Sequence, residues 1–253
     1  MKSAYLTIDD APSQDFAAKV DFLHQRNIPA LFFCVGEFIE PHLSEVEYAI
    51  QNGFLIGNHS FHHPHFSDLT LEDCKGEIRE TDELIDQVYS RSGVARQARY
   101  FRFPYFDTGG DASGQAYEAK WSRPRSDWFQ YEFGDKRLAL QEYLQNLGYR
   151  QPAFDGINLR YSDDPDLLNG VDVHCTFDQA EYWLDKRDAP WGLSNEDAIL
   201  ARIDEDFPYE GRSLNRPDTV DIILVHDHEK TTELFYRIIT RYVEKDIRFL
   251  PIP

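Results

Sequence analysis

Four short motifs with acidic, histidine and arginine side chains recur along this chain of 253 residues, and each lies where an apolar run that predicts a strand ends. In chain order they occupy residues 7–10, 59–63, 102–105 and 224–226. In an α/β architecture, the carboxyl ends of parallel strands meet at one edge, so residues far apart in sequence assemble there. The combination supplies metal ligands, a base and an acid from different strands, and it predicts an active site at that edge.

His59 and His63 are the candidate metal-binding histidines. Their i, i+4 spacing places both on one side of a helical turn, where they can reach one ion. Asp10 ends a predicted strand at the same rim and is the natural third ligand, which leaves a coordination position open for water. A lone histidine is more often a structural residue, but the aspartate pair favours the metal site. His62 and His65 do not keep this spacing and are predicted to be spare.

Asp9 is the candidate general base. Adjacent side chains at a strand end start in different directions, so Asp10 can bind an ion while Asp9 takes a proton from water whose pKa that ion lowers. Taken alone, the pair would more simply cap the following helix, because Pro12 comes two residues later. Arg102, on a neighbouring predicted strand, would keep Asp9 ionised through a charge-assisted hydrogen bond. The alternative for Arg102 is a surface ion pair of little energetic value.

His226 closes the apolar run 220–225 and is a candidate general acid for a leaving group. The alternative is a structural histidine at the end of a strand. Asp227 and His228 follow directly, and the sequence assigns neither of them a role.

The composition limits the class of protein. A chain of this length, 42% hydrophobic, fits one domain, and its formal charge of -19 argues against nucleic acid and membrane partners. Three widely spaced cysteines do not form a disulfide framework. A predicted strand begins almost at Met1 and no apolar run could span a bilayer, so we expect a cytoplasmic protein.

The apolar pattern predicts repeated βα units, which favour a parallel barrel with helices outside. Strands are expected at residues 3–8, 30–34, 54–57, 100–103, 171–176, 220–225 and 248–250. Helices are expected near residues 16–23, 43–51, 112–120, 136–147 and 234–242, and others after caps at Thr70 and Ser194.

Residues 106–170 interrupt the alternation and predict an insertion that shapes a substrate cleft. It contains an aromatic cluster, Trp121, Trp128, Phe129 and Tyr131. Trp121, Trp128 and Trp183 could stack on sugar faces or be buried in a core with equal ease.

The four motifs, in this order, resemble those of the NodB-type polysaccharide deacetylases of carbohydrate esterase family four. The resemblance covers residues 3–105 and 220–253. It implies a distorted (β/α) barrel of about seven strands and a hydrolytic deacetylase that uses one divalent metal ion. Zinc is the first choice for that ion, with cobalt, nickel or manganese as alternatives.

The resemblance also implies a role for each matching residue. Asp9 resembles the catalytic base, and Arg102 the residue that orients it. Asp10, His59 and His63 resemble the metal ligands.

Three further positions match residues around the acyl group. Tyr105 matches the residue whose backbone N–H helps to form the oxyanion hole, Leu224 the wall of the acetyl pocket, and His226 the acid.

The family's fourth motif, Asp-x-x-Asp-Trp, orients the acid and supplies a pocket-lining Trp, and here it is altered. The nearest segment keeps the spacing of the two acids as Asp178 and Glu181, with Tyr182 in place of Trp and Trp183 one position late. We favour this segment over residues 126–128 because it follows a predicted strand. Which of Asp178 and Glu181 faces the acid stays open.

Three functions are compatible with these residues. The first is removal of acetyl groups from N-acetylated sugars, in preference to O-acetylated ones. The second is hydrolysis of a small cyclic imide or ureido compound. The third is non-catalytic carbohydrate binding, against which the presence of both a base and an acid argues. The partner is thus a carbohydrate or a small amide, and the sequence leaves the oligomeric state open.

Overall fold

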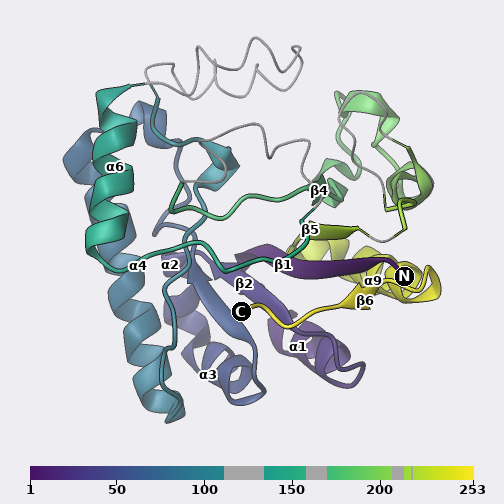
Figure 1. The fold of residues 1–253 in the computed structure, drawn as a ribbon, viewed down its shortest axis with the longest axis horizontal. Coiled ribbons are helices and arrows are strands. Elements are labelled where there is room, and N and C mark those ends of the chain that lie inside the picture. The colour runs from purple at the N-terminus through teal and green to yellow at the C-terminus, as the bar shows by residue number, and fades with distance from the viewer. Residues whose placement is uncertain (111–133, 158–169, 207–213, 218) are drawn as a thin grey trace.

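The computed structural model describes residues 1–110, 134–157, 170–206, 214–217 and 219–253 (Figure 1). The helix predicted at 112–120 and the aromatic residues Trp121, Trp128, Phe129 and Tyr131 lie outside this part of the chain. The proposal that residues 106–170 shape a cleft therefore stays a prediction.

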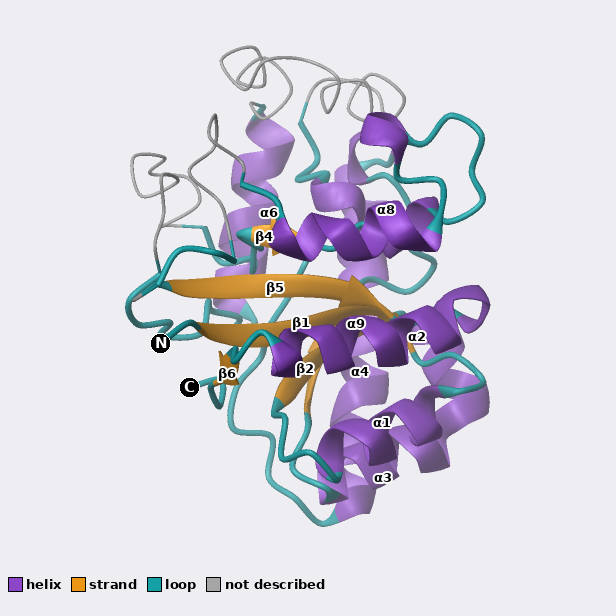
Figure 2. Cartoon of the chain, turned by 90° about the vertical axis from the view of Figure 1, so that its right-hand side faces the viewer, coloured by secondary structure: helices purple, strands orange, loops and turns teal. Residues whose placement is uncertain are grey.

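A parallel sheet of six strands forms the centre of the described residues. The strand order is β3-β2-β1-β5-β4, with β6 paired to the start of β1. In Figure 2 the arrows of β1 and β5 run side by side in one direction, and both chain termini lie at the edge where these arrows begin. The strands are β1 (Ser3–Ala11), β2 (Ala30–Cys34), β3 (Leu55–Asn58), β4 (Phe177–Asp178), β5 (Val220–His226) and β6 (Arg248–Phe249).

Helices surround this sheet, and their apolar faces supply the other half of the core. The described helices are α1 (Phe16–His24), α2 (Gly36–Ile39), α3 (Leu43–Gln51), α4 (Leu71–Ser92), α6 (Asp135–Asn146), α8 (Glu196–Ala201) and α9 (Thr232–Glu244). Every residue of β2 is buried, as expected for a strand between two others with side chains packed on both faces. No helix in the described residues is long and apolar enough to cross a membrane.

Helix boundaries follow local sequence signals. Thr70 caps α4 as predicted: its side chain accepts the N–H of Asp73, and Gly93 ends the helix with φ 72°. The predicted cap of α8 is wrong by one residue, because Asn195 and not Ser194 accepts the N–H of Ala198. Helix α6, predicted at 136–147, packs Leu140 and Leu144 into a cluster beside α4.

The strand predicted at 100–103 is reduced to a single bridge between Phe101 and Asn58. Pro104 has no N–H to continue the pairing, and Tyr105 and Phe106 turn the chain with φ values of 56° and 53°. The N–H of Val173 donates to the Phe101 carbonyl at 2.8 Å, so this segment still links β3 to the segment that leads into β4.

The strand predicted at 171–176 is also displaced, to Phe177–Asp178. Thr176 explains part of the displacement: its hydroxyl accepts the N–H of Ile222 at 2.8 Å, where a strand would offer a backbone carbonyl. The parallel α/β architecture is confirmed. The count of about seven strands is not, because the described residues contain six.

Candidate active site

A β-bulge at the end of β1 brings two carboxylates to one place. Strand β1 runs three residues further than predicted, and its register against β2 shifts between Ile8 and Ala11. Asp10, inside the bulge, has φ 62°, a left-handed conformation that aspartate tolerates better than most residues. A regular strand would send Asp9 and Asp10 to opposite faces. With the bulge, both carboxylates lie near His59: Asp9 Oδ2 is 3.6 Å and Asp10 Oδ1 is 3.5 Å from His59 Nε2.

Asp10, His59 and His63 form a cluster in which one ligand atom from each lies within 4.8 Å of the others. Asp10 Oδ1 is 3.5 Å from His59 Nε2 and 3.1 Å from His63 Nε2. His59 follows β3 directly, and His63 lies on the turn after it with φ 56°. The structure therefore brings the three predicted metal ligands together.

The donor atoms of this cluster fit a cation. The carbonyl of Arg102 lies 2.8 Å from His59 Nδ1 and can only accept, so Nδ1 carries the proton. Burial lowers the pKa of His59 to about 4, so its ring is neutral at pH 7 and Nε2 presents a lone pair. That lone pair faces Asp10 Oδ1, a buried oxygen that accepts no hydrogen bond from the described residues. Two electron-rich atoms that face each other without a proton between them are stabilised by a shared cation.

Asp10 is anionic in this arrangement. Burial alone would raise the pKa of its carboxyl, but His63 and a hydrogen bond from His228 outweigh burial and hold that pKa well below its ordinary value. Two imidazoles and one carboxylate are a donor set suited to zinc, and three protein ligands leave a coordination position for water or substrate.

Asp9 is held by Arg102, as predicted. Arg102 is fully buried and donates to Asp9 Oδ1 at 2.6 Å and to the Thr7 hydroxyl at 3.0 Å. Its remaining donors reach the carbonyls of Val173 and His174 at 2.9 and 3.1 Å. Because every arm of the guanidinium is fixed, Oδ1 of Asp9 is immobilised, while Oδ2 lies 3.6 Å from His59 Nε2 and faces the cluster.

His226 lies beside Asp9, since the two residues are register partners in β1 and β5. Glu181, fully buried, accepts the backbone N–H of His226 and places Oε1 3.4 Å from His226 Nδ1. Burial would lower the pKa of His226, but the negative charges of Glu181, Asp10 and Asp178 raise it to about 10. Nε2 is then the ring nitrogen that can give a proton to a leaving group.

The altered fourth motif lies around His226. Of the two candidates left open by the sequence, Glu181 contacts His226 directly. Asp178 belongs to the same cluster within 4.8 Å, but it accepts the N–H of Ala180 at 2.8 Å and the hydroxyl of Tyr182 at 3.2 Å.

Tyr182, not Trp183, packs against His226, with ring centroids 4.7 Å apart in an edge-to-face arrangement. Trp183 is half-buried and packs on the main core beside Lys186. The tyrosine at the position of the family's Trp thus makes the contact with His226. The role of Trp183 as a pocket wall stays a prediction.

Tyr105 lies at the rim of the cluster. Its ring, 41% exposed, stacks on His65 at 4.0 Å and meets His63 edge-to-face at 4.6 Å. Leu224 is buried in β5 opposite Thr7. The positions of Tyr105 and Leu224 are compatible with the predicted roles at the acyl group, which stay predictions.

The two histidines predicted to be spare have other partners. His62 Nδ1 lies 2.8 Å from Glu77 on the protein surface, and His65 Nδ1 lies 3.1 Å from buried Asp107. Neither belongs to the metal cluster.

Sequence reasoning missed a buried ion pair behind the site. Lys19 Nζ lies 2.5 Å from Asp227 Oδ1, and both side chains are fully buried. Asp227 also accepts the N–H and the hydroxyl of Ser13, each at 2.7 Å. A lysine on the otherwise apolar face of a helix was the available signal, since such a group needs a buried partner.

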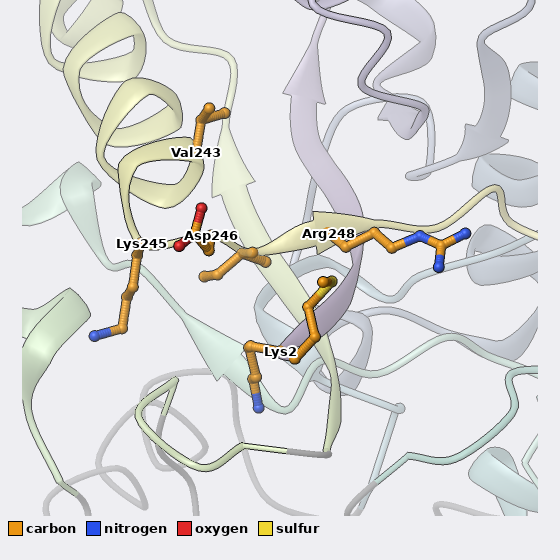
Figure 3. A pocket seen from close by; sticks show the side chains of 7 residues that line it. Lys2, Val243, Lys245, Asp246 and Arg248 are labelled. Carbon is orange, nitrogen blue, oxygen red and sulfur yellow. The ribbon is translucent and has the colours of Figure 1, made fainter.

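A hollow at the opposite end of β1 does not compete with this site. It is lined by Met1, Lys2, Val243, Lys245, Asp246, Ile247 and Arg248. Figure 3 shows Arg248 extending away from Lys245, and the amine of Lys2 is bound by Asp221 and Thr219. These charged groups do not converge on a common point.

Residues 1–120 match the family model for polysaccharide deacetylases. A peptidoglycan-N-acetylglucosamine deacetylase from Bacillus cereus is 33% identical over 101 residues, which are 40% of this chain and 35% of that protein. A chitooligosaccharide deacetylase from Rhizobium leguminosarum bv. trifolii is 31% identical over 100 residues, 39% of this chain and 46% of that protein. The chain thus spans less than half the length of these curated relatives.

Solved structures share the fold across nearly the whole chain. A family 4 carbohydrate esterase from Streptomyces lividans, in complex with acetate, matches with a TM-score of 0.58 and 19% identity over 98% of this chain and 91% of that one. A family pseudoenzyme from Bacillus anthracis also has a TM-score of 0.58, at 16% identity over 98% of this chain and 63% of that one. Because an esterase and a pseudoenzyme share this fold equally, activity must be argued from the site. The sequence similarity to the polysaccharide deacetylases is carried by residues 1–120 of this chain.

Proposed function

We propose that this chain is a divalent-metal-dependent deacetylase that hydrolyses the N-acetyl group of sugar residues. The observation that carries the proposal is the cluster Asp10, His59 and His63, with a buried carboxylate oxygen that no described residue satisfies. A base and an acid, Asp9 and His226, lie on the adjoining strands. A carbohydrate-binding protein would need neither the cluster nor this pair.

A cation held by Asp10, His59 and His63 would act as a Lewis acid on water and on the acetyl carbonyl. Zinc suits the donor set best. Asp9 would take the proton of the attacking water through Oδ2, because Oδ1 is occupied by Arg102. The hydrogen bond from Arg102 to Oδ1 fixes the orientation of the Asp9 carboxylate.

His226 would protonate the amide nitrogen as its bond to the acetyl carbon breaks, so that the amine stays on the sugar and acetate is released. Glu181 and the backbone of β5 hold the ring, and the raised pKa keeps it protonated until this step. The backbone N–H of Tyr105 would stabilise the oxyanion, and Leu224 would line the acetyl pocket.

The chemistry of the site and the relatives both support the proposed substrate class. An amine leaving group must be protonated by an acid, and His226 can supply the proton. The alcohol that leaves an O-acetyl ester depends less on such an acid. The relatives from Bacillus cereus and Rhizobium leguminosarum are a peptidoglycan-N-acetylglucosamine deacetylase and a chitooligosaccharide deacetylase. A sugar without charge also avoids the repulsion that a chain with net charge -19 would exert on an acidic polymer.

Acetate release from N-acetylated chitooligosaccharides by the zinc-loaded protein tests this proposal. We expect release that a chelator abolishes and zinc restores. His63→Ala should lose it, while His62→Ala, which changes an exposed histidine bound to Glu77, should keep it. Hydrolysis of a cyclic imide without acetate release would favour the amidohydrolase instead. Oligosaccharide binding without any hydrolysis would identify a binding protein.

A further inference from the structure

His228 makes a contact that neither the proposed chemistry nor the family motifs use. Its Nε2 lies 2.7 Å from Oδ2 of Asp10, at the end of the site where β5 leaves the sheet. The other carboxylate oxygen, Oδ1, is the one that faces His59 and His63. The two oxygens of Asp10 are thus divided between a hydrogen-bond partner and the metal cluster.

We propose that His228 is a positioning residue for Asp10. Its Nε2–H donates to Oδ2 and holds the carboxylate so that Oδ1 points at the shared position between the two histidines. The inference rests on the proposed metal site and deepens it by adding a residue behind the ligands. Hydrogen-bonded partners of this kind orient metal ligands and set their affinity.

The backbone of His228 is anchored firmly enough for this task. Its carbonyl accepts Lys19 Nζ at 3.1 Å and the N–H of Thr231 at 3.3 Å. Lys19 in turn forms the buried ion pair with Asp227, the residue before His228. The main chain of His228 is therefore held by a fully buried lysine, which distinguishes it from a mobile histidine on the protein surface.

The same ion pair ties together the two loops that carry the site. Asp227 accepts the N–H and hydroxyl of Ser13, which lies three residues after Asp10. Its own N–H donates to the carbonyl of Asp9 at 2.8 Å. The loop after β1 and the loop after β5 are therefore locked in one arrangement, and the distance from His228 to Asp10 is set by it.

Asp10 needs such support because of its backbone. With φ 62° it occupies a sparsely populated region, and residues there keep their conformation only when their surroundings define it. The hydrogen bond from His228 restrains the side chain of Asp10, the cluster member that lies in the β-bulge.

Zinc affinity, measured by competition with a chromophoric chelator, tests the inference without any substrate. We expect His228→Ala to weaken zinc binding by about 10–100-fold, the usual effect of removing a residue that orients a ligand. His228→Gln should recover most of the affinity, because its carboxamide N–H can still donate to Oδ2. The side chain is 37% exposed, so truncation opens no core cavity, and His62→Ala is the matched control.

X-ray absorption of the zinc-loaded protein separates positioning from direct ligation. We expect two imidazoles around zinc in both the wild-type protein and His228→Ala. Three imidazoles that fall to two in the variant would make His228 a ligand, and an unchanged zinc affinity in both variants would give it no role. Either result, or a wild-type protein that binds no zinc, overturns the inference. Intact zinc binding without acetate release would count against the proposed function alone.

Discussion

Asp9→Asn is expected to lower kcat for deacetylation by about 10²–10⁴-fold, the usual contribution of a positioned acid–base group. The asparagine side chain has the same shape but cannot take a proton from water. Its carbonyl oxygen can still accept the hydrogen bond from Arg102, so the geometry around the site should persist. Zinc affinity should change little, because Asp10 is the assigned carboxylate ligand. Steady-state kinetics and a zinc titration of the same preparation provide both values.

This experiment distinguishes the base from the metal ligand, which distances alone do not, because the two aspartates lie almost equally far from His59. His59 Nε2 is 3.6 Å from Asp9 Oδ2 and 3.5 Å from Asp10 Oδ1. A parallel loss of zinc and activity in Asp9→Asn would make Asp9 a ligand and exchange the two roles. Asp10→Asn is the matched variant, and we expect it to lose zinc first and activity as a consequence.

His226→Asn is expected to lower kcat for an N-acetyl sugar by a similar factor, about 10²–10⁴. The side-chain amide of Asn can take the place of Nδ1 beside Glu181, but it has no equivalent of the Nε2 proton. An activated aryl acetate loses a phenolate that needs no proton, so its hydrolysis should be nearly unaffected. Equal losses on both substrates would contradict the assignment of His226 as the acid and would indicate a role in binding or folding.

The pH profile of kcat/KM is a second measure of the same residue. The acid must be protonated, so activity is retained below its pKa and lost as the pH rises through it. The pKa of His226 is raised to about 10, with burial opposing and Glu181 as the largest favourable cause. Glu181→Gln should therefore move the alkaline limb to lower pH, by about 1–3 units for the loss of an adjacent opposite charge. Asp178→Asn should move it less, since Asp178 contributes less to the raised pKa.

The candidate metal cluster could be predicted from sequence because its ligands depend on residue type and on where strands end. Asp10, His59 and His63 converge as expected, and so do Asp9 and Arg102. Parallel strands bring these ends to one edge whatever the details of the packing.

The details that decide orientation could not be predicted. The bulge in β1 depends on the register against β2, which no local pattern in residues 7–11 reveals. The choice between Asp178 and Glu181 depended on how the turn after β4 is built, where Ala180 has φ 60°. His228 approaches Asp10 only because a buried ion pair joins two loops more than two hundred residues apart in sequence.

The positions and lengths of two strands were also predicted incorrectly. The apolar runs at 100–103 and 171–176 predict regular strands, but side-chain and proline effects interrupt the backbone ladder there. Pro104 removes a donor, and the Thr176 hydroxyl takes a hydrogen bond that a carbonyl would have accepted. Apolar periodicity reports burial: residues 100–103 are all buried, and so are Asp172, Val173 and Thr176, so the sequence predicts the core more accurately than the hydrogen bonding.

Anomalous scattering at the zinc edge from crystals of the loaded protein would locate the ion and test whether Asp10, His59 and His63 bind it. We expect one strong peak about 2.0–2.2 Å from Nε2 of His59 and of His63, in contact with Asp10 Oδ1. The second acidic cluster, Asp178, Glu181 and His226, should be empty, because we propose that His226 is the acid there. A peak at that second cluster, or at His62 or His65, with none between His59 and His63, would show that Asp10, His59 and His63 are not the metal site.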